Sequence, residues 1–95
     1  MYTVIRQYSG GGASQIADEI ESKLEEVTSL LKGVTGFVGY TLSRTSDGMT
    51  SVTVCQDKAG ADESVRVAAE FIGKNVTAQS DAPLVSEGET ILHIS

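Results

Sequence analysis

The chain has very few of the residues on which metal and redox chemistry depends. Its 95 residues include one cysteine, one histidine and no tryptophan. A structural zinc site takes about four cysteine or histidine ligands, and a disulfide takes two cysteines. Cys55 and His93 supply neither set, so we expect no metal site and no internal disulfide. A single unpaired thiol favours a reducing compartment, and we expect a cytoplasmic protein.

Long apolar runs and clustered basic residues are also missing. A transmembrane helix needs about 18–20 consecutive apolar residues, and the runs here are only a few residues long. Met1-Tyr2-Thr3 leads directly into a strand pattern, without the basic start and apolar core of a signal peptide. The net charge is −6 and the basic residues are scattered, unlike a surface that binds phosphates. We therefore expect no membrane and no nucleic acid among the partners.

The first third of the chain predicts a strand followed by a helix. Residues 2–8 are rich in β-branched and aromatic types, which favour a strand. Between residues 13 and 32 apolar side chains recur every three or four positions, which predicts one amphipathic helix. The apolar face of that helix would be Ile16, Ile20, Leu24, Val27 and Leu31.

The remainder predicts a hairpin, a second helix and a last strand. The turn dipeptide Asp47-Gly48 joins strands at 36–44 and 49–56. A turn at 57–62 leads into a helix that could end as early as Gly73, residues 77–88 form a polar loop around Pro83, and residues 89–94 form the last strand. The apolar face of this second helix comprises Val65, Ala68, Ala69, Ile72 and Val76, with Phe71 beside them.

The predicted order of elements is β-α-β-β-α-β, with no linker that divides the chain. We therefore expect a single domain over residues 1–95. Two split β-α-β units of this length are typical of the ferredoxin-like sandwich, an α+β fold. Its four antiparallel strands lie in the order 4-1-3-2, and both helices cover one face of the sheet.

The other face of that sheet carries apolar groups as well. Strand 36–44 places Val38, Tyr40 and Leu42 on one side and Phe37 with Gly39 on the other. A face in contact with water should be polar at alternate positions. Ordinary exposure of apolar atoms is one explanation. The other is that two sheets pack together in a dimer, which would give a small domain more buried surface.

Three segments resemble the dimeric α/β-barrel superfamily, in particular the small bacterial proteins grouped with antibiotic biosynthesis monooxygenases. They are residues 34–40, Val-Thr-Gly-Phe-Val-Gly-Tyr, residues 51–58, Ser-Val-Thr-Val-Cys-Gln-Asp-Lys, and residues 68–71, Ala-Ala-Glu-Phe. The resemblance implies a homodimer whose two sheets form a barrel. It also implies a pocket for a small apolar or aromatic molecule between the sheet and the helices of each subunit.

The reactive residues of that superfamily are mostly missing from this chain. Its haem-degrading members resemble one another in an axial histidine on the second helix, with a tryptophan and an asparagine in the pocket. Residues 61–77 contain no histidine, and the only asparagine is Asn75. From this comparison we expect no cofactor, and haem is disfavoured.

Four residues are candidates for the ligand pocket, each with a plainer structural alternative. Tyr40 lies in mid-strand and combines an aromatic ring with a hydroxyl, and Phe71 could form an apolar wall. Both could instead be ordinary core residues. Arg6, if buried, needs an acidic partner or a ligand carboxylate. His93 would titrate near neutral pH in a pocket, or it could lie in the core or at an interface. No residue is identified as catalytic.

Two further constellations do not match known chemistry. Cys55 and His93 lie on predicted strands that are separated by a third strand, about 9–10 Å apart, too far for a nucleophile and its base. The run Gly10-Gly11-Gly12 lacks the lysine of a phosphate-binding P-loop and the spacing of a dinucleotide-binding loop, so we expect a simple turn.

Three functions remain open from the sequence. The first is a monooxygenase-like or isomerase-like protein that acts on a small aromatic or polyketide-like compound. The second is a homodimer that binds a small ligand, or is purely structural, without chemistry. The third is a regulatory module similar to the ACT domains, which share the β-α-β-β-α-β order.

Overall fold

Four antiparallel strands form one sheet in the order β2-β3-β1-β4, which is the predicted order read from the opposite edge. The structure, a computed structural model, describes residues 1–79 and 81–94. The elements are β1 (Tyr2–Tyr8), α1 (Ala13–Glu21), α2 (Leu24–Lys32), β2 (Phe37–Thr45), β3 (Gly48–Cys55), α3 (Lys58–Asn75) and β4 (Leu84–Glu89). The ferredoxin-like fold predicted from the sequence is therefore confirmed.

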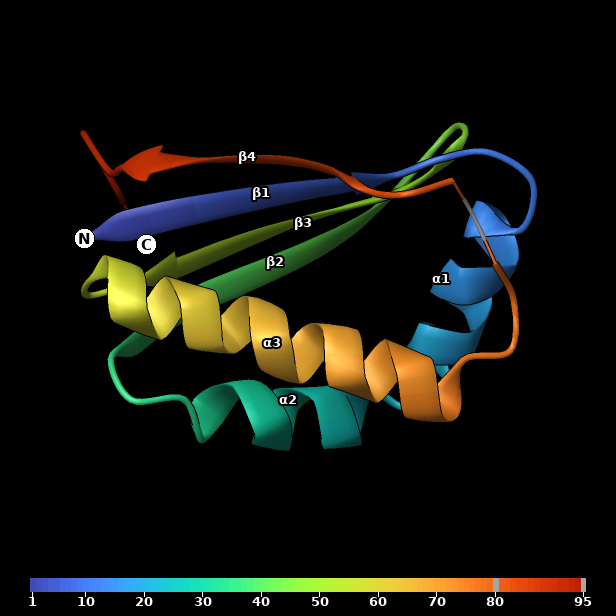
Figure 1. The fold of residues 1–95 in the computed structure, drawn as a ribbon, viewed down its shortest axis with the longest axis horizontal. Helices are drawn as coiled ribbons and strands as arrows, with labels where there is room; N and C mark the ends of the chain where they lie inside the picture. The colour runs from blue at the N-terminus through green and yellow to red at the C-terminus, as the bar shows by residue number, and fades with distance from the viewer. Residues whose placement is uncertain (80, 95) are drawn as a thin grey trace.

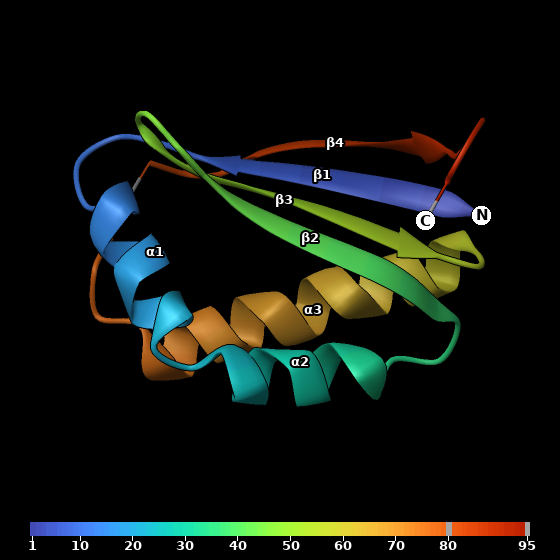
Figure 2. The same ribbon diagram turned by 180° about the vertical axis from the view of Figure 1, so that it is seen from behind.

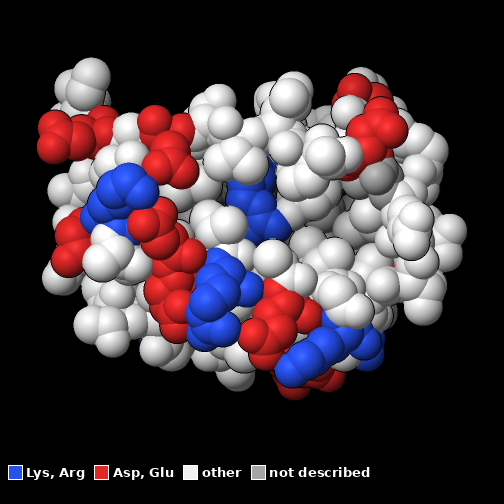
Figure 3. Space-filling model, viewed as in Figure 1, with Lys and Arg blue, Asp and Glu red and all other residues white. Residues whose placement is uncertain are grey.

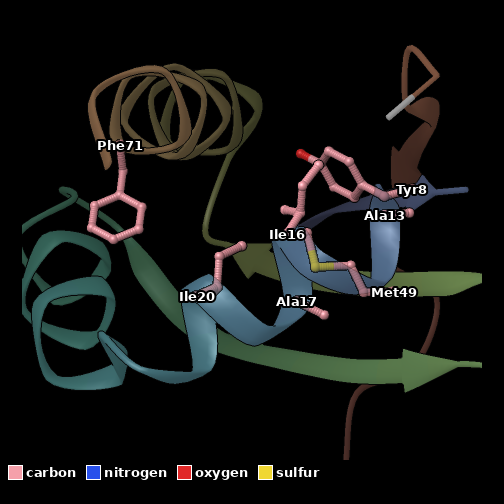
Figure 4. Close-up of a cluster of buried hydrophobic side chains, with 7 residues drawn as sticks. All are labelled: Tyr8, Ala13, Ile16, Ala17, Ile20, Met49 and Phe71. Carbon is pink, nitrogen blue, oxygen red and sulfur yellow. The ribbon is translucent and has the colours of Figure 1, made fainter. Parts of the chain in front are cut away.

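Helices α1, α2 and α3 lie on one side of the sheet. In Figures 1 and 2, α2 and α3 run side by side beneath the strands, and α1 covers one end of the sheet. None of the helices in the described part of the chain has the length and hydropathy needed to cross a bilayer. The main core lies where α1 and α3 meet the sheet, and Figure 4 shows its side chains converging from these elements. Its buried members are Tyr8, Ala13, Ile16, Ala17, Ile20, Met49 and Phe71.

The predicted helix over residues 13–32 is two helices. It breaks at Ser22 and Lys23, where the Ser22 hydroxyl donates a hydrogen bond to the Glu19 carbonyl at 2.6 Å. A serine that bonds to the backbone in this way competes with the helical ladder. The break lets α1 cover the sheet end while α2 turns to lie along α3. Consequently Leu24, predicted on the apolar face of the single helix, is 49% exposed.

The second predicted helix begins earlier than the sequence suggested. It begins at Lys58, because the carboxylate of Asp57 accepts a hydrogen bond from the Gly60 amide at 2.8 Å and caps the first turn. It continues past Gly73 to Asn75. The predicted turn at 57–62 is therefore mostly helical.

The position of the last strand was predicted wrongly. Residues 84–88, assigned to the polar loop 77–88, form β4 together with Glu89, and β4 pairs with β1 in the register Tyr2↔Glu89 to Gln7↔Leu84. β4 is an edge strand with mostly exposed side chains, so backbone pairing rather than an apolar pattern determines it. Residues 90–94 lie beyond it and form no strand. Residue 80 of the predicted loop lies outside the described residues.

The strand registers separate the two faces of the sheet. Opposite Cα partners share a face, so Tyr8, Met49 and Arg44 point toward the helices. An irregularity between Phe37 and Gly39 turns Phe37 to the helix side as well, which corrects the predicted alternation. The paired residues on the other face, called the open face below, are all uncharged: Thr3, Ile5, Gln7, Gly39, Thr41, Ser43, Thr50, Val52, Val54, Leu84, Ser86 and Gly88.

Glu19 of α1 holds the segment that follows α3. Its carboxylate accepts hydrogen bonds from the Thr77 hydroxyl at 2.7 Å and from the Thr77 and Ala78 amides at 3.3 and 3.2 Å. These hydrogen bonds, that of the Thr77 hydroxyl above all, lower the pKa of Glu19. A carboxyl whose pKa is lower in the folded state stabilises the fold above its unfolded pKa. That contribution is lost as the pH falls through the folded pKa.

Replacing Glu19 with glutamine is therefore expected to lower the melting temperature at neutral pH. The difference from the unmutated chain should shrink at acid pH, as the pH falls through the lowered pKa at which the carboxyl of the folded unmutated chain also becomes protonated. Thermal unfolding followed by circular dichroism across this range measures it. Glu25→Gln, at an exposed position on α2, is the matched control and should have little effect. An equal loss of stability at all pH values would contradict this role of Glu19.

Candidate functional site

A small cavity lies between the helix side of the sheet and the three helices. The cavity has a volume of about 30 Å³, enough for about two water molecules. Its helix wall is entirely apolar, while its sheet floor carries polar groups. The wall residues are Ile20 of α1, Val27, Leu30 and Leu31 of α2, and Val67, Ala68, Phe71 and Ile72 of α3.

The polar groups of the floor come from three adjacent strands. Arg6 and Tyr8 lie on β1, Ser51 on β3 and Tyr40 on β2. Arg6 stands directly opposite Ser51 in the β1–β3 ladder. Leu42 and Met49 complete the floor. The period of two along β1 explains why Arg6 and Tyr8 share this face.

Arg6 is buried, with 6% of its surface exposed. Its guanidinium donates a hydrogen bond to the hydroxyl of Tyr8 and lies 5.3 Å from the centre of the Tyr8 ring, a cation–π distance. Burial lowers the pKa of Arg6, and the nearby hydroxyl of Tyr40 partly opposes this. Arginine still remains charged at any physiological pH. Tyr8 therefore holds the guanidinium in place without neutralising it.

Tyr40 stands on the floor of the cavity as a neutral phenol. Burial raises the pKa of its hydroxyl, and the Arg6 charge and a hydrogen bond with Ser51 only partly counteract this. The phenol therefore keeps its proton at neutral pH. A protonated hydroxyl beside a cation can donate a hydrogen bond to a ligand oxygen.

The cavity adjoins a larger groove between α2 and β2. This groove has a volume of about 310 Å³, which is at the lower end of the range for ligand pockets. The residues common to the cavity and the groove are Val27, Leu31, Tyr40 and Leu42. Only Leu31 of α2 is fully buried. Because α2 has few buried side chains, we expect it to move away from the sheet more easily than the other two walls of the cavity.

The structure brings three of the four predicted pocket residues together. Arg6, Tyr40 and Phe71 all line the cavity. His93 does not, because its ring lies on the open face, 3.9 Å from the point where a Cβ on Gly39 would stand. Ser51, which also forms part of the floor, was not predicted from the sequence. The alternation along residues 49–55 could have revealed it once the helix side of β3 was known.

Cys55 lies apart from this cavity, fully buried on the helix side of β3. Burial raises the pKa of its thiol, and a hydrogen bond with Ser64 opposes this. A buried thiol with a raised pKa is a poor nucleophile. His93 lies on the opposite face of the sheet, so the two do not form a catalytic pair.

The charged side chains of α3 lie on the outer surface of that helix, away from the cavity. Figure 3 shows blue and red groups alternating across the lower part of the view, where Figure 1 places that helix. Ion pairs within α3 link Lys58 to Asp62, Arg66 to Glu63 and Glu70, and Lys74 to Glu70. Such exposed pairs contribute little stability, and this surface is a solvated helix face.

Solved structures of low sequence identity share this fold. A protein of unknown function from Nitrosomonas europaea has a TM-score of 0.71 at 17% identity, over 99% of this chain and 91% of that chain. A MhuD mutant with two manganese protoporphyrin IX molecules per active site has a TM-score of 0.69 at 16% identity, over 100% and 99%. The ActVA-Orf6 monooxygenase of Streptomyces coelicolor, in complex with nanaomycin D, has a TM-score of 0.67 at 15% identity, over 99% and 90%.

A dimeric ferredoxin-like protein from an uncultured marine organism also matches, with a TM-score of 0.67 at 10% identity, over 99% of this chain and 95% of that chain. Likeness at these identities establishes the fold. The predicted resemblance is confirmed at the level of the fold. No model of a protein family matches the chain, and no curated protein matches its sequence.

The expectation that no cofactor binds and that haem is disfavoured is wrong for a chain of this fold. It depended on the lack of a histidine on the second helix and of a tryptophan. The MhuD mutant holds porphyrins in the same fold. The missing residue types therefore do not exclude a porphyrin.

Proposed function

We propose that this chain is a homodimeric protein with monooxygenase-like or isomerase-like activity on a small aromatic or polyketide-like molecule. The observation that carries the proposal is the cavity with an apolar helix wall and a floor of Arg6, Tyr8, Tyr40 and Ser51. A flat apolar ligand with a few oxygens matches these surfaces. The likeness of fold to a monooxygenase in complex with nanaomycin D supports this substrate class.

In this proposal the side chains of the cavity bind and orient the ligand. The apolar wall around Phe71 excludes water, which strengthens every electrostatic interaction inside. Tyr40 keeps its proton and donates a hydrogen bond to a ligand oxygen. Arg6, held by Tyr8, stabilises negative charge that develops on an oxygen of the bound molecule.

The bound ligand needs more room than the cavity offers. About 30 Å³ accommodates water but not an aromatic ring system. The adjoining groove of about 310 Å³ shares Val27 and Leu31 of α2 as its boundary with the cavity. We propose that α2 shifts outward, so that groove and cavity join into one site that reaches Tyr40.

The composition of the open face favours the proposed homodimer. Its central residues Ile5 and Val52 are half-buried and uncharged, although the chain carries 20 charged residues, seven basic and 13 acidic. The segment after β4 adds Ile91, Leu92 and Ile94, which are 100%, 75% and 80% exposed. Burying an uncharged face and these side chains against a second copy is favourable.

Oxygen uptake with a panel of hydroxyquinols tests the enzymatic part. We expect uptake above the rate without protein for at least one compound. Tyr40→Phe should reduce that rate about 10-fold, the value of one hydrogen bond at the upper end of the neutral range. Tight binding of one compound without uptake across the panel would contradict catalysis and favour the alternative, a homodimer that binds a ligand without chemistry.

Haem is a second candidate ligand, because a porphyrin is bound in the same fold by the MhuD mutant. Met49 faces the cavity, and methionine occurs as a ligand of haem iron. A titration with haem should then produce a sharp Soret band at one stoichiometry. An unchanged spectrum would remove this candidate.

A further inference from the structure

Arg6 is the one charged side chain among the buried residues that the structure describes. A charge removed from water is strongly unfavourable unless an opposite charge accompanies it. Every ion pair formed by the described residues joins partly or largely exposed side chains, and Arg6 takes part in none of them. The guanidinium therefore lacks a counter-charge within the described chain.

The groups around Arg6 bind it without neutralising it. Tyr8 and Tyr40 are neutral hydroxyls, and Ser51 is the cross-strand neighbour. Glu87 of β4 also points to the helix side, opposite Val4. Its carboxylate is engaged elsewhere, because it accepts a hydrogen bond from Tyr2 at 3.0 Å and lies 3.5 Å from the Lys58 amine.

The N–H groups of Arg6 that make no hydrogen bond to Tyr8 are available to a ligand in the cavity. Arginine has five N–H donors, and the hydroxyl of Tyr8 accepts one of these bonds. The residue itself lines the cavity floor. The planar guanidinium fits a carboxylate, or two neighbouring oxygens of a deprotonated aromatic or diketone, through paired hydrogen bonds.

We infer that the ligand of this cavity carries an anionic oxygen, as carboxylate, phenolate or enolate, that pairs with Arg6. The inference rests on the proposed binding function and narrows its substrate class. The ligand supplies the negative charge that the described residues do not provide for Arg6. Its aromatic body then lies against the apolar wall formed by Phe71 and Leu30.

Benzoate and benzamide are a matched pair of probes, because they have nearly the same shape and differ in charge. Calorimetry on the intact wild-type protein should show benzoate binding about 10- to 100-fold more tightly than benzamide, as expected for hydrogen bonds to a charged group. Arg6→Gln should reduce this preference to within about threefold. Arg6→Lys keeps the charge and should retain most of it. Arg44→Gln, at an exposed ion pair with Asp18 and Glu21, is the control and should leave it unchanged.

A second arm separates carboxylate from phenolate recognition. The visible absorbance of p-nitrophenol reports its ionisation, and binding near Arg6 should shift the bound probe toward the phenolate in the wild type but not in Arg6→Gln. A shift with p-nitrophenol and no preference for benzoate would assign the site to phenolates and enolates. The reverse result would assign it to carboxylates.

Three results would overturn the inference. The first is equal affinity of the wild type for benzoate and benzamide, without a change in the ionisation of bound p-nitrophenol. It would leave the cavity as a ligand site but contradict the claim that its ligand is anionic. Failure of all three probes to bind contradicts the proposed function as well. An unchanged preference in Arg6→Gln removes Arg6 as its source. If Arg6→Gln fails to fold, Arg6→Lys and the wild-type preference decide the question.

Discussion

Replacing Val52 with aspartate is expected to separate the proposed homodimer into single chains. Val52 lies on β3 at the centre of the open face, between Ile5 of β1 and Thr41 of β2. In a twofold dimer each interface would bury two copies of the new charge. The penalty for a buried unpaired ion is several kcal/mol, so we expect the dissociation constant to rise at least about 1000-fold.

Light scattering at micromolar concentration measures this change. The wild type should give twice the chain mass of 10.0 kDa, and Val52→Asp should give the single mass. Val52→Thr, which has nearly the same shape and no charge, is the control and should remain dimeric. A wild type that scatters as a single chain would contradict the role of the open face.

Replacing Phe71 with alanine is expected to destabilise the chain by about 3–5 kcal/mol, the usual cost of removing a buried phenylalanine ring. Phe71 is 6% exposed and belongs both to the core with Ile20 and to the wall of the cavity. For a chain of this length the loss corresponds to a fall in melting temperature of at least about 12 °C. Phe71→Leu fills most of the space and should cost about 1.5 kcal/mol or less.

The enlarged cavity should also change how ligands affect stability. An apolar cavity left by a deleted side chain can bind a small aromatic molecule. Benzoate should therefore raise the melting temperature of Phe71→Ala more than that of the wild type. Thermal unfolding with and without benzoate measures both effects. A loss of stability below about 1 kcal/mol in Phe71→Ala would contradict the burial of this ring.

Local patterns in the sequence were sufficient for β1, the β2–β3 hairpin and the order of the elements. They were insufficient where contacts between distant parts of the chain determine the secondary structure. The break at Ser22 and Lys23 depends on how α1 and α2 fit against the sheet. β4 depends on its pairing with β1, and its side chains are mostly exposed, so no apolar pattern marks it.

The candidate site was predictable by residue type but not by geometry. Arg6, Tyr40 and Phe71 were recognised as candidates, and all three line the cavity. The sequence could not tell which face of the sheet meets the helices, because both faces carry apolar groups. For that reason Ser51 was missed, and His93 was grouped with residues that lie on the opposite face.

The measurement that tests the account most directly is a methyl-resolved NMR titration of the wild type with benzoate. If the ligand binds between sheet and helices, the largest shifts should fall on Val27, Leu31 and Ile72, which line the cavity. Methyl groups of the open face, such as those of Ile5 and Val52, should shift least. The opposite distribution, or no saturable shift at the cavity methyl groups, would contradict the claim that this cavity is the ligand site.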